Sequence, residues 1–119
     1  GILIKENHIA AAGSIARAVE LCEKFGPHTL AIEVEVTDMD ELNQALDVAA
    51  DVIMLDNMEI PEIRECVTRV KGRALLEASG GIDLETAGAI AATGVDIISV
   101  GALTHSAPSS DISFLIDNS

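Results

Sequence analysis

The sequence predicts an α/β fold of about five parallel strands that alternate with helices, as part of a TIM-like βα barrel. Apolar segments end at Lys5, Glu35, Asp56, Ser79 and Gly101, with steps of 30, 21, 23 and 22 residues, each close to the length of a strand, a loop and a helix. The chain has two Phe and no Trp or Tyr, so its core is made of Ala, Ile, Leu and Val. That composition is typical of parallel sheets covered by helices.

The first half of the chain predicts three strands and two helices. Gly1 to Ile4 is the first apolar strand segment, and Ser14 caps a helix that ends at Gly26 and Pro27. A strand is expected from Thr29 to Val36. Asp38 and Glu41 resemble a capping box, which predicts a second helix before a strand over Val52 to Leu55.

The second half predicts two further helices and two further strands. Pro61 suits the first turn of a helix, and Ala74 to Ala78 follows as a strand. A short helix is expected to begin at Asp83 and to stop at Gly94, before a strand from Val95 to Val100. A complete barrel needs eight strands and about 250 residues, so we expect these 119 residues to be the C-terminal piece of a longer protein.

The charge of the chain restricts its partners. A net charge of −13 with only seven Lys and Arg argues against nucleic acid and anionic membrane surfaces, which need clustered cations. No segment approaches the roughly 20 apolar residues of a membrane span. Cys22 and Cys66 lack the spacing of a zinc site, so we expect two buried thiols in a reducing cytoplasm.

Carboxylates end two neighbouring strands of the predicted sheet. Alternation from Ile32 to Val36 puts Glu33 and Glu35 on one face, with Glu35 at the barrel mouth, unless this is a solvated edge strand with its polar residues outward. We expect Asp56 to lie at the same height on the next strand. Such a pair could hold Mg²⁺ together with substrate phosphate oxygens, or could act as acid and base.

Glycines follow the last two predicted strands, where βα barrels often hold phosphate. Ser79, Gly80 and Gly81 lie where a helix is expected to begin, and glycine lets the backbone approach an anion closely there. Such a triplet alone is usually just a tight turn. Gly101, and His105 shortly after it, follow the adjacent strand. The two segments together predict a phosphate site.

Lys5 is the only cation at the end of a predicted strand, which favours a functional role. His8 and His105 also lie beyond strand ends, where each could donate to an anion or cap a loop. A Schiff-base role for Lys5, as in an isomerase or aldolase, needs a lowered pKa, whereas two nearby carboxylates would raise it.

Five motifs in consistent order strongly resemble quinolinate phosphoribosyltransferases, also called nicotinate-nucleotide pyrophosphorylases. They are Lys5-Glu6-Asn7-His8, Glu33-Val34-Glu35-Val36, Leu55-Asp56-Asn57, Glu77-Ala78-Ser79-Gly80-Gly81-Ile82 and residues 95–105. Within them only Glu6 departs from the family's usual residue, Asp, and it keeps the carboxylate.

The resemblance implies phosphoribosyl transfer from phosphoribosyl pyrophosphate to quinolinate with loss of carbon dioxide. The products would be nicotinate mononucleotide and pyrophosphate, as a step of NAD biosynthesis, with Mg²⁺ as cofactor. Glu35 and Asp56 would both face the ribose. Both would also contact the metal, indirectly through water or pyrophosphate. Lys5 would meet the quinolinate carboxylate or the pyrophosphate, and the residues implied to hold the phosphate are Ser79, Gly80, Gly81, Gly101 and His105.

The resemblance also implies that part of the site lies elsewhere. Both substrates carry several negative charges, which one lysine cannot balance beside two carboxylates. In the resembled family an N-terminal domain and the early barrel supply further cations, and the site forms across the interface of a dimer or a dimer-based hexamer. Residues 1–119 would then be the C-terminal portion of the barrel domain. The alternatives are another βα-barrel phosphate-binding enzyme and a non-catalytic assembly module that pairs through unclosed strand edges.

Overall fold

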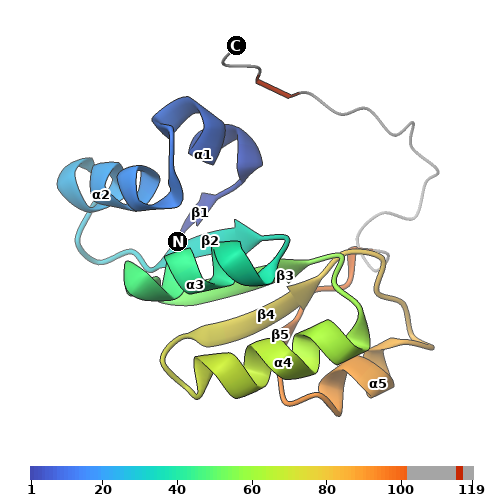
Figure 1. Cartoon of the computed structure of the whole chain (residues 1–119). Helices are drawn as coiled ribbons and strands as arrows, with labels where there is room; N and C mark the ends of the chain where they lie inside the picture. The colour runs from blue at the N-terminus through green and yellow to red at the C-terminus, as the bar shows by residue number, and fades with distance from the viewer. Residues whose placement is uncertain (102–114, 117–119) are drawn as a thin grey trace.

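Five parallel strands form one curved sheet in the computed structural model, which describes residues 1–101 and 115–116 (Figure 1). The strands follow one another across the sheet in chain order, β1-β2-β3-β4-β5, as in the wall of a βα barrel. Their bounds are β1 (Ile2–Ile4), β2 (Ile32–Val36), β3 (Val52–Asp56), β4 (Leu75–Ser79) and β5 (Ile97–Ile98). The predicted alternation of strands and helices is confirmed.

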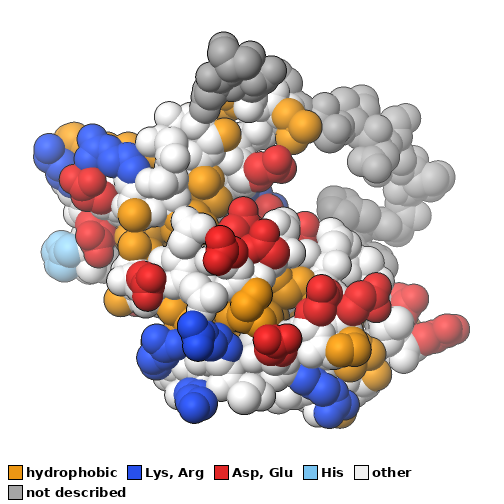
Figure 2. Space-filling model, viewed as in Figure 1, with side chains coloured by type: hydrophobic (Ala, Val, Ile, Leu, Met, Phe, Trp, Pro, Cys, Tyr) orange, Lys and Arg blue, Asp and Glu red, His pale blue; other side chains and the backbone are white. Residues whose placement is uncertain are grey.

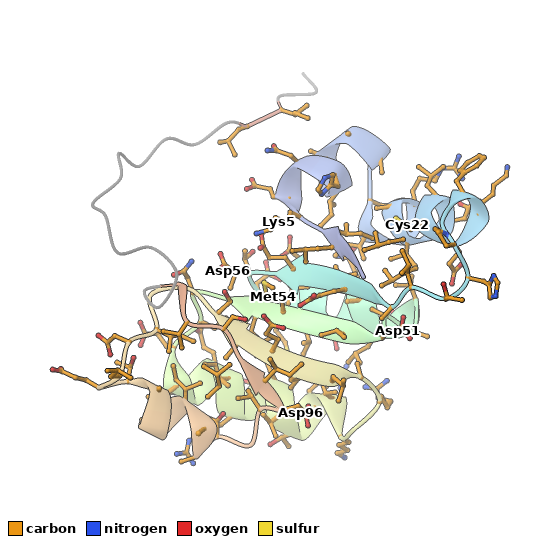
Figure 3. All side chains as sticks on the ribbon, turned by 180° about the vertical axis from the view of Figure 1, so that it is seen from behind. Lys5, Cys22, Asp51, Met54, Asp56 and Asp96 are labelled. Carbon is orange, nitrogen blue, oxygen red and sulfur yellow. The ribbon has the colours of Figure 1, made fainter. Side chains whose placement is uncertain are left out.

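Helices cover one face of this sheet, and Figure 3 shows the opposite face uncovered. Those that pack on the sheet are α2 (Ile15–Phe25), α3 (Met39–Asp47), α4 (Ile60–Val70) and α5 (Ala87–Ala91), whereas α1 (Glu6–Ala12) follows β1 and packs mainly on α2. Val34 and Val36 are completely buried on the helix side, and Ile53 and Leu55 of β3 lie beside them. The core is therefore the layer between the sheet and the helices.

The side chains that alternate with the buried ones along each strand lie on the uncovered face. Leu75 and Ile97 are 50% and 37% exposed there, near the amino ends of β4 and β5. Apolar side chains on this face would line the interior of a closed barrel, so their exposure follows from the open shape of the five-stranded sheet.

Helix starts follow the predicted capping residues in three cases. The Ser14 hydroxyl accepts a hydrogen bond from the N–H of Arg17 at the start of α2. The Asp38 carboxylate accepts from the N–H groups of Asp40 and Glu41 at the start of α3, and Pro61 lies in the first turn of α4. The fourth helix start is later than predicted: the Asp83 carboxylate binds the N–H groups of Glu85 and Thr86 in a turn, so α5 begins at Ala87.

The sequence interpretation missed one helix entirely. Residues between Lys5 and Gly13 form α1, which Gly13 ends in the left-handed conformation at φ +93°. At seven residues α1 is too short for a clear helical period. Its Ile9 and Ala12 nevertheless pack against the core, which accounts for its stability in this position.

Two predicted strands are shorter in the structure. The segment before β2 turns instead of extending, because the N–H of Leu30 donates to the carbonyl of Pro27. Of residues 95–100 only Ile97 and Ile98 form ladder pairs, on β4 alone. An edge strand with a single neighbour has half the hydrogen bonds of an inner strand, which explains the shorter pairing.

Two aspartates, each directly before a strand, secure the amino end of the strand that precedes it in the sheet. The Asp51 carboxylate accepts from the N–H of Ile32 at 2.8 Å, and that of Asp96 accepts from the N–H of Leu76 at 2.8 Å. Both lie at the end of the sheet opposite to Lys5 and Asp56 (Figure 3). Nowhere in residues 1–101 and 115–116 does a helix have the length and apolar character that a bilayer crossing needs.

Candidate functional site

The predicted site residues of β1 and β2 form an ion pair at the carboxyl end of the sheet. Lys5 follows β1, and its Nζ lies 2.7 Å from Oε2 of Glu35, whose side chain is 14% exposed. The hydrogen bond to Glu35 is the main cause that raises the pKa of Lys5, and the charges of Glu35, Asp56 and Glu33 add to it. Lys5 is therefore a protonated cation, as expected from the carboxylates around it, and is poorly suited to a Schiff base.

The carboxylates of β2 and β3 share a face but not a height. β2 pairs on both sides, with β1 and with β3, so its glutamates do not lie on a solvated edge strand. Glu35 pairs with Met54, which puts Asp56 two residues further along, about 6 to 7 Å toward the carboxyl end. The prediction of equal height was wrong, because the stagger between neighbouring strands is a property of the sheet rather than of either segment.

Two more glutamates lie below this mouth on the same face. Glu77 of β4 is 9% exposed and accepts a hydrogen bond from the Ser99 hydroxyl. One carboxyl oxygen of Glu33 is buried without a hydrogen-bond partner among the described residues. The pKa of Glu33 is raised mainly by burial. The charge of Glu77 and a hydrogen bond with it raise this pKa further.

We expect Glu33→Gln to stabilise the protein at neutral pH. A carboxyl group whose pKa is higher in the folded state than in the unfolded state lowers stability once pH rises through the folded pKa, whereas below the unfolded pKa this loss is absent. A neutral amide of the same shape avoids the loss. The midpoint of thermal unfolding should therefore rise at pH 7, and the gain should shrink as pH falls through the raised folded pKa and be absent below about pH 4.

Glu23→Gln is the matched control for this substitution, because it removes the same charge from an exposed position on α2. It should change the midpoint much less than Glu33→Gln does at pH 7. An equal rise in both variants would mean that overall charge, and not the burial of Glu33, is responsible.

The glycine segment after β4 lines a pocket of about 380 Å³ together with Gly101. Gly80 and Gly81 have φ values of +88° and +60°, a region that favours glycine. Within the described residues no acceptor binds their N–H groups. The structure thus brings Ser79, Gly80, Gly81 and Gly101 together in an arrangement suited to an anion.

A residue that the sequence interpretation did not assign joins this pocket to the carboxylates. Asn57 follows β3 with φ +53°, and its Nδ2 donates to Oδ2 of Asp56 at 2.9 Å. Its backbone N–H donates to the Ser79 carbonyl at 3.0 Å. The signals in the sequence were its place in the Leu55-Asp56-Asn57 motif and its position directly after a strand, where asparagine tolerates the left-handed conformation.

The two predicted histidines have different outcomes. His8 lies in α1, where its Nδ1 accepts from the N–H of Lys5 at 3.0 Å. Of the two roles predicted for His8, the structure thus shows capping. The His8 side chain accepts from the backbone of Lys5, the residue directly before α1. His105 lies outside the described residues.

The carboxylates at the strand ends suit a metal ion that is bound jointly by the protein and by substrate oxygens, rather than by protein ligands alone. Across the part of the chain that the structure describes, no three His, Cys, Asp or Glu side chains converge as metal ligands. Glu35 and Asp56 supply two carboxylates on one face, and Glu35 is already paired with Lys5. Mg²⁺ commonly uses one or two carboxylates and completes its shell with water and phosphate oxygens, which this set allows.

A larger groove of about 540 Å³ lies on the helix side, and none of the predicted site residues that the structure describes lines it. Arg69, Lys71 and Arg73 line it, and Figure 2 shows basic side chains gathered near the carboxyl end of α4. The Arg69 Nε donates to Asn43, and Arg73 donates to the last carbonyls of α4. These contacts hold helices together and end one of them, so we place the site at the strand ends.

The fold and the strand-end residues define part of a parallel βα-barrel domain with an acidic mouth beside a glycine-lined pocket. The family model described as quinolinate phosphoribosyl transferase, C-terminal domain, matches residues 1–115. The chain therefore belongs to the quinolinate phosphoribosyltransferase family.

Individual relatives agree with this assignment. The chain is 45% identical over 113 residues to a probable nicotinate-nucleotide pyrophosphorylase (carboxylating) of Bacillus subtilis, covering 95% of this chain and 39% of the relative. It is 36% identical over 115 residues to the human nicotinate-nucleotide pyrophosphorylase (carboxylating), covering 94% and 39%. The solved nicotinate-nucleotide pyrophosphorylase of Francisella tularensis matches with a TM-score of 0.84 and 51% identity, covering 87% of this chain and 37% of that one. The chain thus spans about two fifths of the length of these relatives.

Proposed function

We propose that this chain forms part of an enzyme that transfers a phosphoribosyl group from phosphoribosyl pyrophosphate to quinolinate. The transfer releases pyrophosphate, and loss of carbon dioxide then gives nicotinate mononucleotide, as a step of NAD biosynthesis. The observation that carries the proposal is the pairing of Asp56 with Ser79 across β3 and β4. This pairing puts the Asp56 carboxylate beside the glycine-lined pocket. A ribose 5′-phosphate needs two such neighbouring groups, because its phosphate lies at one end and its reacting carbon at the other.

Each residue has a physical role in this proposal. The backbone of Ser79, Gly80, Gly81 and Gly101 would hold the 5′-phosphate, with His105 nearby in sequence. The carboxylates of Glu35 and Asp56 would face the ribose, where positive charge develops as the bond to pyrophosphate breaks. Lys5, protonated and half exposed, would bind a quinolinate carboxylate or the departing pyrophosphate.

We further propose Mg²⁺ as the cofactor, bound near Glu35 and Asp56 through water or pyrophosphate oxygens. When bound, the ion would neutralise charge on the leaving pyrophosphate. The protein's own part is to keep Glu35 in place through Lys5 and Asp56 in place through Asn57.

We propose that further strands and a second subunit complete the site. Lys5 is the one cation at the strand ends of the described residues, whereas the two substrates together carry several negative charges. The uncovered sheet face supports additional barrel strands, and an N-terminal domain and a homodimer or dimer-based hexamer would supply further cations. We also propose a cytoplasmic location, although some plant relatives are named as mitochondrial.

Product formation tests the proposal directly. The assembled enzyme is incubated with quinolinate, phosphoribosyl pyrophosphate and Mg²⁺, and nicotinate mononucleotide and carbon dioxide are quantified. Both products should appear in equal amounts, and removal of Mg²⁺ with a chelator should stop the reaction. Absence of nicotinate mononucleotide with all components present would contradict the proposal.

The 119 residues on their own should show little or no transferase activity. One lysine cannot balance the substrates' charges beside the site carboxylates. The measurement is the same assay with the isolated chain, and circular dichroism establishes that it has folded. Turnover at a rate similar to that of the assembled enzyme would show that the additional cations are unnecessary.

A further inference from the structure

Asn57 makes contacts that a simple turn residue does not need. It lies directly after β3 and adopts φ +53°, a conformation that asparagine tolerates better than most side chains. A turn would require only this conformation, which glycine supplies at lower cost. The side chain of Asn57 therefore needs a separate explanation.

The contacts of Asn57 reach both halves of the proposed site. Its Nδ2 donates to Oδ2 of Asp56 at 2.9 Å, and its backbone N–H donates to the carbonyl of Ser79 at 3.0 Å. The amide also lies directly against Gly80. A Cβ on Gly80 would be 2.4 Å from Oδ1 and 2.5 Å from Cγ of Asn57, closer than real contacts allow.

These distances give a reason for glycine at position 80 that is independent of its backbone angle. Gly81 also has a positive φ, but a Cβ there would come no closer than 3.9 Å to Asn57. Gly80 is thus the point at which the glycine turn rests on the amide. The same amide group holds one oxygen of Asp56, so the carboxylate and the turn share one support.

We propose that Asn57 is a positioning residue that sets the distance and orientation between the Asp56 carboxylate and the phosphate-binding turn. The inference rests on the proposed function of this site and deepens it. With one Asp56 oxygen held by Nδ2, the other is left to face the sugar. With the turn held against the amide, the phosphate lies at a defined separation from that carboxylate, which favours a phosphorylated pentose over shorter or longer sugar phosphates.

The first test uses Asn57→Gly in the assembled enzyme. This substitution keeps the positive φ and the backbone N–H to Ser79 but removes the amide, so folding should be retained. We expect kcat to fall about 10- to 100-fold, the effect of one hydrogen bond to a charged group, and KM for phosphoribosyl pyrophosphate to rise. KM for quinolinate should change little, a split that general loss of structure would not produce.

The second test asks whether Asn57 acts through Asp56. In an Asp56→Ala background, Asn57→Gly should lower kcat by less than about threefold, because the carboxylate it positions is already gone. A further 10- to 100-fold loss in that background would overturn the inference. Unchanged kcat and KM in Asn57→Gly alone would also overturn it, and the proposed function would then still stand if Asp56→Ala is inactive.

The third test does not depend on activity. Gly80→Ala should lower the thermal midpoint strongly when Asn57 is present and clearly less in the Asn57→Gly background, where only the cost of the positive φ remains. Equal losses in both backgrounds would show that the amide does not support the turn, and would overturn the inference. If the enzyme proves inactive with quinolinate, the proposed function fails and this cycle alone decides whether Asn57 holds the turn.

Discussion

Asp56→Ala should lower kcat of the assembled enzyme by about 100- to 1,000-fold, the range seen when a group that stabilises transition-state charge is removed. Asp56 lies at the carboxyl end of β3, on the uncovered face and next to Ser79. Its negative charge would stabilise the positive charge that develops on the ribose. Because this charge is small in the bound substrate, kcat should fall more than KM rises.

Glu35→Ala should have an effect of similar size, for an additional reason. It leaves Lys5 without the partner that lies 2.7 Å away, so the position of that cation is lost as well. The measurement is steady-state kinetics with quinolinate and phosphoribosyl pyrophosphate. Asp47→Ala, an exposed aspartate at the end of α3, is the matched control and should keep the normal rate. Normal rates in both site variants would refute the assignment of this mouth as the catalytic site.

Leu55→Ala should destabilise the fold by about 2 to 5 kcal/mol, the usual range when leucine is truncated in a well-packed core. Leu55 is 1% exposed, and it precedes Asp56 on the helix side of β3. β3 lies in the middle of the sheet, where neighbours on both sides limit the collapse of a cavity. The loss is measured as a shift in the midpoint of chemical denaturation.

Leu84→Ala removes the same atoms from a side chain that is 85% exposed, and serves as the control. It should change stability by less than about 0.5 kcal/mol. Equal effects of the two substitutions would mean that β3 does not form the centre of the core.

Local patterns were sufficient to predict most of the fold. Ser14 and Asp38 mark helix starts because capping depends on a side chain and the backbone N–H groups two or three residues later. Pro61 marks one because its fixed φ and missing N–H suit the first turn of a helix. The alternation from Ile32 to Val36 predicted that Glu33 and Glu35 share one face and the valines the other, because the period of a strand is two residues. The short helix α1 was missed because its seven residues are stabilised by packing rather than by their own pattern.

The candidate site was predicted as a set of residues but not as an arrangement. Lys5, Glu35, Asp56 and the glycines were identified because parallel strands bring their carboxyl ends to one edge. The Lys5–Glu35 ion pair and the different heights of Glu35 and Asp56 depend on pairing between strands that are distant in sequence. Asn57 was overlooked because its partners, apart from Asp56, belong to the next βα unit.

The alternation of strands and helices along the chain, the two faces of residues 32–36 and the family of this chain can all be read from its residues, because each depends on short-range periodicity or on motifs within a few positions. The register between strands, the raised pKa of Glu33 beside Glu77 and the contact between Asn57 and Gly80 came only from the tertiary structure. These features arise from residues that are at least 19 positions apart in sequence. Their distances are set by how the whole sheet packs and staggers, and no local pattern carries that information.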